Sequence, residues 1–337
     1  MILEEGVELY NVAELIEENG SGRLFSRIPN RLRLSLNESA RIQALTLAGS
    51  EIRFNLNGAK ATIVLKTEGE GWGIAEVFQG PFQVGWHYIT SQPTEITVSL
   101  PDNLETLEKA NKKDGYLFDP RLTRIVLPHL VPVRLIDINV RDGSIVPPRA
   151  GQTPSQRYLA YGSSITHGAS AVRPTGTYAK RTAELLGVDL ISLGFGGGAH
   201  GESQMADYIA GRKDWDFASL ELGINMVGSF EVAEFRDRVV YFINRISEAY
   251  PEKWLFCIDL FTFYADLDEG SKTQKFFRKV VREAVKKVNN PKVVHIDGRK
   301  ILPGFSGLCV DLVHPSSSGM EQMALNLSRF ITRKMRY

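Results

Sequence analysis

One stretch of the chain reads Arg157-Tyr-Leu-Ala-Tyr-Gly-Ser-Ser-Ile-Thr-His-Gly168, an apolar run that passes into glycine, two serines and a polar segment. This pattern predicts a buried strand that turns directly into a helix. A serine at such a turn is exposed at the sheet edge, beside the backbone N–H groups and the positive end of the helix. Serines before helices are more often simple caps, so this stretch alone indicates a fold and not yet a function.

The same alternation of short apolar runs and helical patterns continues downstream. Further strands are predicted at residues 189–193, 217–222, 254–260 and 293–296, and the segments between them repeat apolar residues with the 3.6-residue period of helices. Repeated strand–helix units predict a parallel sheet covered by helices and joined by right-handed crossovers. Ligands bind such sheets at the carboxyl ends of the strands, so catalytic groups are expected in the loops that follow strands.

Upstream of residue 141 the periodicity is different. Apolar and polar residues alternate at 32–36, 52–56, 63–65, 96–100 and 136–140, which predicts strands with one buried face. Short strands separated by turn signals such as Asn57-Gly58 suggest a β-sandwich or jelly roll, with helices expected only at 7–19 and 103–112. Because residues 141–156 are rich in Pro and Gly, we predict a β-sandwich accessory domain at 1–150 and a second domain at 151–337.

The composition excludes several classes of protein. The chain has 337 residues, with 40 Lys and Arg against 39 Asp and Glu, so neither nucleic acid nor a membrane surface is an expected partner. No stretch approaches about 18 uninterrupted apolar residues, and Met1-Ile-Leu-Glu-Glu-Gly6 lacks the pattern of a leader, which predicts a cytoplasmic protein. The two cysteines, Cys257 and Cys309, are expected to be reduced thiols.

The loop after the second predicted strand reads Gly194-Phe-Gly-Gly-Gly-Ala-His-Gly201. Its glycines let the backbone approach a bound group closely. One interpretation is a G-x-G-x-x-A dinucleotide site with Glu221 as its acidic residue, although the loop follows the second strand of the domain and not the first. The other interpretation is a loop that presents a backbone N–H group to an oxyanion.

Two further loops carry polar side chains. Asn225 follows the third strand, where its amide can donate to an oxyanion or bond its own loop. Asp311 stands three residues before His314, close enough to accept from imidazole Nδ1–H and leave Nε2 free as a base. A structural histidine that caps the last helix is an equal alternative. Together with the serine, these loops supply a nucleophile, oxyanion stabilisers and an oriented base.

These four blocks resemble, in order and spacing, those of the SGNH hydrolases, also called the GDSL esterase/lipase family. The resemblance covers residues 157–337 and implies a flavodoxin-like three-layer α/β/α fold. It implies that Ser164 is the nucleophile and donates its own backbone N–H to the oxyanion hole. Gly197 best matches the glycine of the second block, with Gly196 and Gly198 as alternative registers.

The last two blocks match Asn225 to the oxyanion asparagine of the family, and Asp311 and His314 to its D-x-x-H motif. Two positions depart from the pattern: Ser163 stands where the family has aspartate before the nucleophile, and Met226 replaces the aspartate after the asparagine. Neither replaced residue carries a proton in the family mechanism, so the expected reaction class does not change.

The resemblance implies a serine ester hydrolase that needs no metal or organic cofactor. Two-domain relatives with a β-sandwich in front include carbohydrate esterases, so short acyl esters of small molecules or oligosaccharides, chiefly acetyl sugars, are the expected substrates. An acyltransferase with the same acyl-enzyme, and a lipase or thioesterase for longer chains, are alternatives. A non-catalytic dinucleotide- or sugar-binding protein is a further one.

Several other residues carry weaker expectations. Trp72, Trp86 and Tyr88 are available to bind sugars, but core positions are the more usual place for aromatic residues. The motif-loop histidines, His167 and His200, have two interpretations: they line the pocket, or, as is more usual, they are solvated loop residues. Two other carboxylates near strand ends are expected to support His314 if Asp311 points elsewhere: Asp259 and Asp297.

Overall fold

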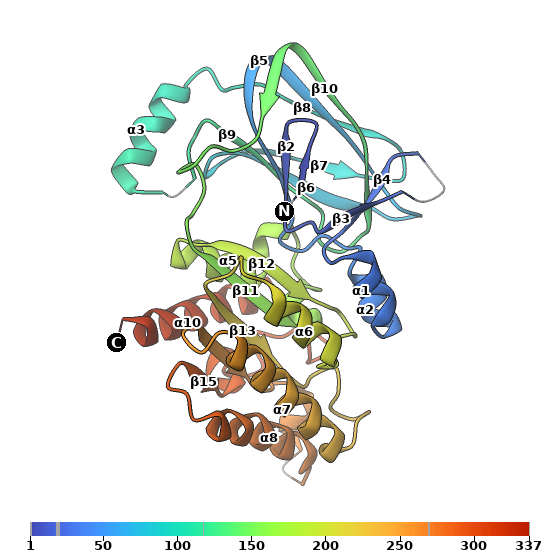
Figure 1. The fold of residues 1–337 in the computed structure, drawn as a ribbon, viewed down its shortest axis with the longest axis vertical. Helices are drawn as coiled ribbons and strands as arrows, with labels where there is room; N and C mark the ends of the chain where they lie inside the picture. Colours follow the sequence, from blue (N-terminus) through green and yellow to red (C-terminus); the bar gives the residue numbers. More distant parts are fainter. Residues whose placement is uncertain (1, 18–20, 117, 269, 337) are drawn as a thin grey trace.

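A computed structural model describes residues 2–17, 21–116, 118–268 and 270–336 (Figure 1). The apolar runs of the second half form one parallel sheet in the order β12-β11-β13-β14-β15, which is the 2-1-3-4-5 order of flavodoxin-like folds. The predicted strands of this half are therefore confirmed, with small differences at their ends. They are β11 (Arg157–Gly162), β12 (Asp189–Gly194), β13 (Phe217–Glu221), β14 (Trp254–Ile258) and β15 (Val293–Ile296).

Helices cover both faces of this sheet, because both faces are apolar. Tyr158 and Ala160 of β11 pack in one core, and Leu159 and Tyr161, which alternate with them, pack in the other. The first core also contains side chains of α5 (Tyr178–Leu186), α9 (Gly298–Ile301) and α10 (Ser317–Met335). The second contains side chains of α6 (Ser203–Gly211), α7 (Val232–Ala249) and α8 (Thr273–Val288).

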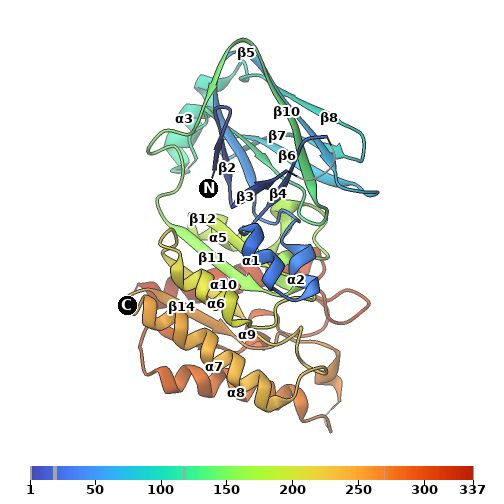
Figure 2. The same cartoon turned by 45° about the vertical axis from the view of Figure 1, so that its right-hand side comes forward.

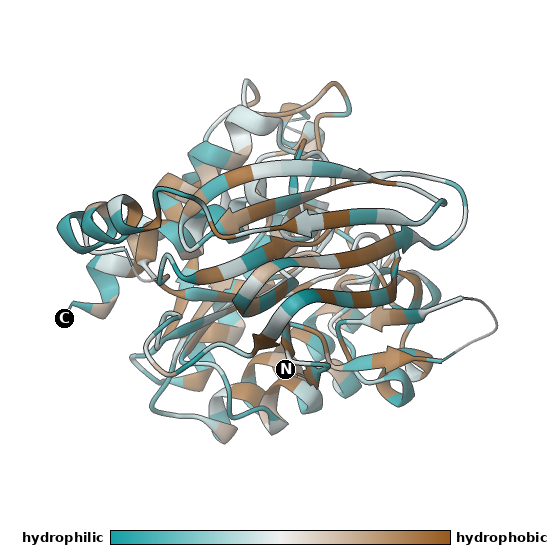
Figure 3. Cartoon of the chain, turned by 90° about the horizontal axis from the view of Figure 1, so that it is seen from above, coloured by the Kyte–Doolittle hydropathy of each residue, from teal (hydrophilic) through white to brown (hydrophobic). Residues whose placement is uncertain are grey.

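The first half is antiparallel and is built around two long strands, β5 (Glu51–Thr67) and β10 (Val133–Val146). The first part of β5 also pairs with β2 and β9, and its last part pairs with β8. Hydrophobic and hydrophilic residues alternate along many of these strands (Figure 3). The other strands are β1 (Ile2–Glu4), β2 (Val7–Tyr10), β3 (Glu14–Ile16), β4 (Arg23–Ser26), β6 (Gly73–Gln79), β7 (Phe82–Ile89), β8 (Thr94–Val98) and β9 (Leu122–Val126).

Three local predictions for this half are wrong. Described residues within 7–19 form β2 and β3 and no helix, because all four residues of β2 are buried between β1 and β5; residues 18 and 19 lie outside the described residues. Residues 32–36 fall largely in α1 (Asn30–Ser35): Leu32 and Leu36 pack against one core while Leu34 is exposed, which is a helical spacing. Asn57-Gly58 lies inside β5, where Gly58 pairs with Gly143 at close backbone approach. The predicted helix at 103–112 is confirmed as α3 (Leu104–Asp114).

The segment between β4 and β5 packs against the second half of the chain. Ile28, Leu36, Ala40 and Ala44 are buried in the same core as α6 and α7. These residues come from α1, α2 (Glu38–Gln43) and their flanks, and Figure 2 shows the two helices beside the parallel sheet. A stretch of the predicted accessory domain therefore supplies part of the core of the other domain.

A buried charge network also joins the two halves. Glu51 of β5 is fully buried and accepts hydrogen bonds from Arg53 and Arg124 of the front half and from Lys180 of α5, the last over 2.6 Å. Arg53 donates both terminal nitrogens to Asp189 at the start of β12, over 2.6 and 2.9 Å. Over the described residues, no helix has the length and apolar character that a membrane span requires.

Candidate active site

The first candidate residue lies at the carboxyl end of β11, where the chain turns into α4 (Ser164–His167). Ser163 caps this short helix: its side chain accepts from Ile165 N–H over 3.1 Å. Ser163, at the position of the family aspartate, is thus the cap of this helix. Ser164, the next residue, is partly exposed at the sheet edge. The backbone N–H of Ser164 has no acceptor among the residues that the structure describes.

Ser164 lies in a hydrogen-bonded chain with His314 and Asp311. Ser164 Oγ is 2.8 Å from His314 Nε2, and His314 Nδ1 is 2.7 Å from Asp311 Oδ2. Because the carboxylate accepts from Nδ1–H, Nε2 is the acceptor that faces the serine hydroxyl.

The carboxylate of Asp311 is held by its own loop. Its second oxygen accepts from the backbone N–H groups of Val313 and His314, over 2.9 and 3.0 Å. Partial desolvation opposes ionisation, but the hydrogen bonds from His314 and from the two N–H groups outweigh it and lower the pKa of Asp311 to about 2.

The loop before α10 holds His314 in place without using it as a helix cap. Cys309 N–H donates to the His314 carbonyl over 2.8 Å, and Tyr264 N–H donates to the Leu312 carbonyl over 2.8 Å. The cap of α10 is Ser316, whose hydroxyl accepts from Gly319 N–H. The alternative in which His314 caps the last helix is therefore wrong.

The glycine loop after β12 lies beside Ser164. Gly198 N–H donates to the Phe195 carbonyl over 3.0 Å, whereas the N–H groups of Gly196 and Gly197 have no acceptor in the described part of the chain. Gly197 is exposed with φ at +68°. A Cβ built on Gly196 would lie 3.6 Å from Ser164 Cβ. The N–H groups of Gly196 and Gly197 are thus available near the serine, and that of Gly198 is not.

Asn225 reaches the same loop from the end of β13. Its Oδ1 accepts from Ala199 N–H over 3.1 Å, which fixes the orientation of the amide. Its Nδ2 has no acceptor among the described residues and is a free donor at this edge of the sheet. The structure therefore brings Ser164, His314 and Asp311 into direct contact, and it joins Asn225 to the glycine loop.

Glu221, proposed above as the acid of a dinucleotide site, lies under the serine turn. One carboxylate oxygen accepts from Ser163 N–H over 2.6 Å and from Thr166 Oγ1 over 3.0 Å. The side chain is buried, and this burial raises the pKa of Glu221. Glu221 is therefore not free to bind a ribose, as the dinucleotide interpretation requires.

The expectation that His167 is solvated is also wrong. His167 is 1% exposed, with Nδ1 3.0 Å from the Gly194 carbonyl and Nε2 2.5 Å from the carbonyl of His129 in the front half. Burial, with the nearby Arg27, lowers the pKa of His167 to about 3. His167 thus packs between the two halves of the chain.

The two alternative carboxylates have other partners. Asp259 accepts from His295 Nε2 over 2.7 Å and from Gly298 N–H over 2.8 Å. Asp297 caps α9 and pairs with Arg299. Neither supports His314, which is bonded to Asp311.

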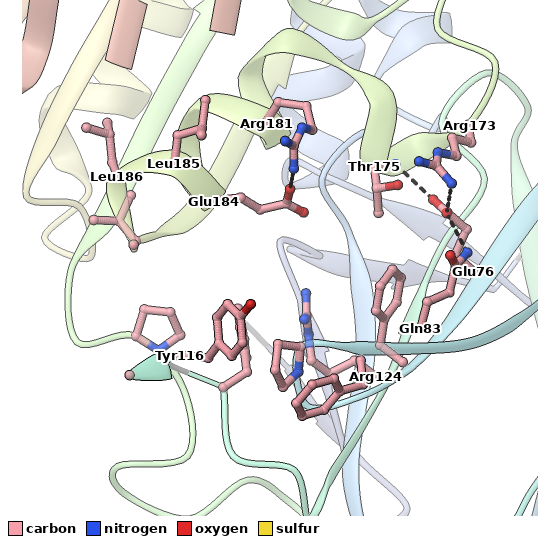
Figure 4. Close-up of a pocket in the computed structure, with 18 residues that line it drawn as sticks. Glu76, Gln83, Tyr116, Arg124, Arg173, Thr175, Arg181, Glu184, Leu185 and Leu186 are labelled. Atoms are coloured by element: carbon pink, nitrogen blue, oxygen red, sulfur yellow. Dashed lines mark hydrogen bonds and ion pairs between the residues drawn. The ribbon is translucent and has the colours of Figure 1, made fainter. Parts of the chain in front are cut away.

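A large cavity of about 700 Å³ lies elsewhere, at the junction of the two halves (Figure 4). It is bounded by β6, β7, the segment between α3 and β9, and α5. Glu76 accepts there from Thr175 N–H over 3.0 Å, and Arg181 pairs with Glu184. None of Ser164, His314 and Asn225 lines this cavity, so it is separate from the candidate catalytic residues.

Sequence reasoning missed the part that the front half plays at this site. Asn37 and Arg27 donate hydrogen bonds to carbonyls of the glycine loop. Asn37 has a local signal as a helix cap, but no sequence pattern connects it with Gly198, which is 161 positions away. Only the folded chain brings these residues together.

The sheet order 2-1-3-4-5, with Ser164 after β11 and with His314 and Asp311 in the loop before α10, agrees with the SGNH arrangement expected from the sequence. Residues 155–332 match the model of the GDSL-like lipase/acylhydrolase family. The chain belongs to this family of lipases and acylhydrolases. A search of curated proteins found no significant match.

Solved structures share the fold over nearly the whole chain. A salicylyl-acyltransferase from a tetracycline biosynthetic pathway is 18% identical, with a TM-score of 0.81 over 97% of this chain and 94% of that one. A family two carbohydrate esterase from Clostridium thermocellum, in complex with cellohexaose, is 16% identical, with a TM-score of 0.61 over 86% and 94%. An acetyl xylan esterase from Butyrivibrio proteoclasticus is 11% identical, with a TM-score of 0.59 over 99% and 97%.

Proposed function

We propose that the chain hydrolyses short-chain acyl esters through an acyl-enzyme on Ser164. The observation that carries this proposal is the continuous hydrogen-bonded chain from Ser164 Oγ through both nitrogens of His314 to Asp311. A serine hydroxyl is a weak nucleophile, and a neutral imidazole in hydrogen-bond contact is the group that activates it. Asp311 keeps the proton on Nδ1 and stabilises the imidazolium that forms.

The reaction has two halves. His314 Nε2 takes the proton of Ser164 as Oγ bonds to the ester carbonyl carbon, and the carbonyl oxygen becomes an oxyanion. The C–O bond to the alcohol then breaks, and His314 returns the proton to the leaving alcohol. Water, deprotonated by His314, attacks the acyl-enzyme in the same way and releases the acid and free Ser164.

The oxyanion requires hydrogen-bond donors that are in place before the charge develops. We assign this role to the backbone N–H groups of Ser164 and Gly197 and to Nδ2 of Asn225. The absence of an acceptor for each of these donors within the described residues supports the assignment. Each such donor contributes a factor of about 10² to 10³ in rate.

A carbohydrate ester, chiefly an acetyl sugar, is the substrate that we propose. Trp72, Trp86 and Tyr88, for which core positions were expected, are all more than half exposed, and their rings meet edge to face with centroids 5.0 and 5.3 Å apart. Trp86 and Tyr88 are two positions apart in β7, so their side chains lie on the same face of the β6–β7 hairpin, and Trp72, just before β6, contacts Tyr88. Exposed aromatic rings of this kind suit the apolar faces of sugar rings, and similar folds occur among carbohydrate esterases.

We infer that residues 1–150 form a jelly-roll-like β-sandwich and residues 151–337 the catalytic domain. The change of neighbours along β5, from β2 and β9 at one end to β8 at the other, supports two layers that share this strand. The exposed rings of Trp72, Trp86 and Tyr88 then belong to the accessory domain.

An acyltransferase is the second candidate. It forms the same acyl-enzyme, but an alcohol of an acceptor takes the acyl group in place of water. The similarity of the whole fold to a salicylyl-acyltransferase favours keeping this candidate. The presence or absence of an acceptor requirement distinguishes the two functions.

Labelling by a fluorophosphonate probe tests the nucleophile. The wild type should be labelled, Ser164→Ala should not be labelled, and the exposed control Ser203→Ala should behave as wild type. Turnover of 4-nitrophenyl acetate should fall by a factor of about 10³ or more in His314→Ala. Labelling that persists in Ser164→Ala would show that another residue is the nucleophile.

A substrate series tests the acyl and alcohol portions. Rates are measured on 4-nitrophenyl acetate, butanoate and octanoate and on acetylated xylo- and cello-oligosaccharides. We expect acetyl esters to be turned over fastest and acetate to be released from the oligosaccharides without an added acceptor. A strong preference for octanoate contradicts the carbohydrate esterase, and acyl transfer to an added alcohol in preference to water supports the acyltransferase.

A further inference from the structure

The peptide unit between Gly198 and Ala199 lies between two asparagines from different halves of the chain. Its carbonyl accepts from Asn37 Nδ2 over 2.9 Å, and its N–H donates to Asn225 Oδ1 over 3.1 Å. A planar peptide transmits orientation from one side to the other. The front-half Asn37 is therefore connected, through one rigid peptide, to the amide whose Nδ2 is the free donor at the site.

The orientation of the Asn37 side chain is set by its other partners. Its Oδ1 accepts from Ala40 N–H over 3.0 Å and caps α2, and its Nδ2 also donates to Glu202 over 2.9 Å. Glu202 in turn accepts from Asn37 N–H over 2.8 Å. With the oxygen and both amide hydrogens engaged, Asn37 has one arrangement that satisfies all its partners.

The other end of the glycine loop is held by Arg27, which is 1% exposed. Arg27 donates to the carbonyls of Ser192 and Gly194 at the end of β12, over 2.9 and 2.7 Å. It also donates to the carbonyls of Gln43 and Thr46 in the front half, over 2.7 and 2.5 Å. Arg27 thus bridges the end of α2, the segment that follows it and the start of the glycine loop.

Close packing leaves α2 little freedom to move relative to this loop. A Cβ at Gly198 would lie 2.4 Å from Ala40 N, so the first turn of α2 rests directly on the loop backbone. Gln43 at the end of α2 is the neighbour of Gly196, 3.6 Å from a Cβ built there. The loop that faces Ser164 is therefore bounded on its other side by the front half.

We propose that Asn37 is a positioning residue for the oxyanion site, acting through the Gly198–Ala199 peptide on the amide of Asn225. This inference rests on the proposed ester hydrolysis at Ser164. Arg27 holds the start of the same loop, so the donors at the site are set by residues of both halves. Asn37 does not touch the substrate.

The expected effect is on the transition state and not on substrate binding. The ester carbonyl gains its negative charge only as Ser164 attacks. A displaced Asn225 amide would therefore stabilise the transition state less and leave the binding of the uncharged ester nearly unchanged. A displacement of about 1 Å in such a group costs up to roughly 10² in rate. A residue with a merely structural role would change the unfolding midpoint and leave the turnover of the folded enzyme unchanged.

Asn37→Ser is the decisive variant, because serine is as good a helix cap as asparagine but cannot donate an amide hydrogen to Gly198. We expect kcat for 4-nitrophenyl acetate to fall about 10- to 100-fold while KM changes little. The affinity for phenylboronic acid, whose adduct with serine is tetrahedral and anionic, should fall in parallel with kcat/KM.

Asn55→Ser is the matched control. Asn55 is a buried asparagine of β5 whose amide donates to the Pro147 carbonyl and to Gln152, away from the glycine loop. This variant should lose stability but keep wild-type kcat when folded. Unchanged kcat in Asn37→Ser, with only a lower unfolding midpoint, would overturn the inference.

Two further measurements keep the inference distinct from the proposed function. If wild type is neither labelled by the fluorophosphonate nor active, the proposed function fails, whatever Asn37 does. If wild type is active, Asn37→Ser is combined with Asn225→Ala. If both residues act on one donor, the fold-loss in kcat of the double variant should be much smaller than the product of the two single fold-losses. A loss equal to that product would show independent effects and contradict the inference.

Discussion

At the scale of single residues, Asp311 decides which nitrogen of His314 carries the proton. Its side chain is 46% exposed, so its charge is screened by water and its main contribution is to hold the imidazole in one orientation. The pKa of Asp311, about 2, keeps the carboxylate ionised at every pH at which an ordinary protein is folded. Loss of activity on mild acidification is therefore not expected to come from this group.

Asp311→Asn should impair turnover more than Asp311→Ala. The oxygen of the introduced amide would still accept from the backbone of Val313 and His314, which points the amide N–H₂ at Nδ1 and moves the imidazole proton to Nε2. That tautomer cannot accept a proton from Ser164, and we expect kcat to fall by about 10⁴. Alanine leaves room for water at Nδ1 and permits the productive tautomer.

The control for this pair is Asp137→Asn. Asp137 is an exposed carboxylate of β10 that, like Asp311, accepts from backbone N–H, here that of Ile138, and it should be silent in the assay. The measurement is kcat on 4-nitrophenyl acetate. A smaller loss in Asp311→Asn than in Asp311→Ala would contradict the assignment of the tautomer.

At the scale of elements, the contact of α2 with the glycine loop depends on one residue without a side chain. Gly198→Ala would place a methyl group 2.4 Å from Ala40 N, a backbone atom that cannot move without shifting α2. Such overpacking costs about 1–3 kcal/mol in the free energy of unfolding. Because the same shift displaces the loop beside Ser164, kcat should fall as well.

Gly211→Ala supplies the control for the added methyl group. Gly211 ends α6, and a Cβ built there meets nothing within 4 Å. We expect this variant to be neutral or more stable by up to about 1 kcal/mol, with unchanged kcat. Urea unfolding and the esterase assay measure both quantities, and a Gly198→Ala variant as stable and active as wild type would refute the close contact.

At the scale of the whole molecule, Glu51 joins the two halves through buried ion pairs. Burial by itself would raise the pKa of Glu51, but Arg124, Arg53 and Lys180 hold it well below its ordinary value. Glu51→Gln leaves these three cations without their shared anion. We expect a loss of about 3–5 kcal/mol in the free energy of unfolding at pH 7.

The pH dependence of this loss has a definite sign. A carboxyl group whose pKa is lower in the folded state contributes its full stability above the pKa of the unfolded chain, about 4.3, and loses it as pH falls towards the folded value. The difference in unfolding free energy between wild type and Glu51→Gln should therefore be constant near neutrality and shrink below about pH 4. Glu234→Gln, which removes an exposed pair with Arg238, should cost less than about 0.5 kcal/mol. A comparable loss in both variants would contradict the role of burial.

Much of the second half was predictable from local pattern. A buried strand needs a continuous apolar run and a helix needs a 3.6-residue period. Both patterns can be recognised within a short continuous stretch of sequence. The same holds for Asp311 and His314, which are three positions apart. Short alternating segments were less reliable, because Leu32, Leu34 and Leu36 fit a strand and a helix equally well until burial decides between them.

By itself, the sequence determined the parallel sheet, the family and the residues from which the catalytic site is proposed. The tertiary structure alone decided that Asn37 and Arg27 hold the glycine loop and that Glu51 joins the halves. The physical reason is that a hydrogen bond depends on distance in space. Partners separated by 161 or 167 positions share no period, so their contact exists only once the chain has folded.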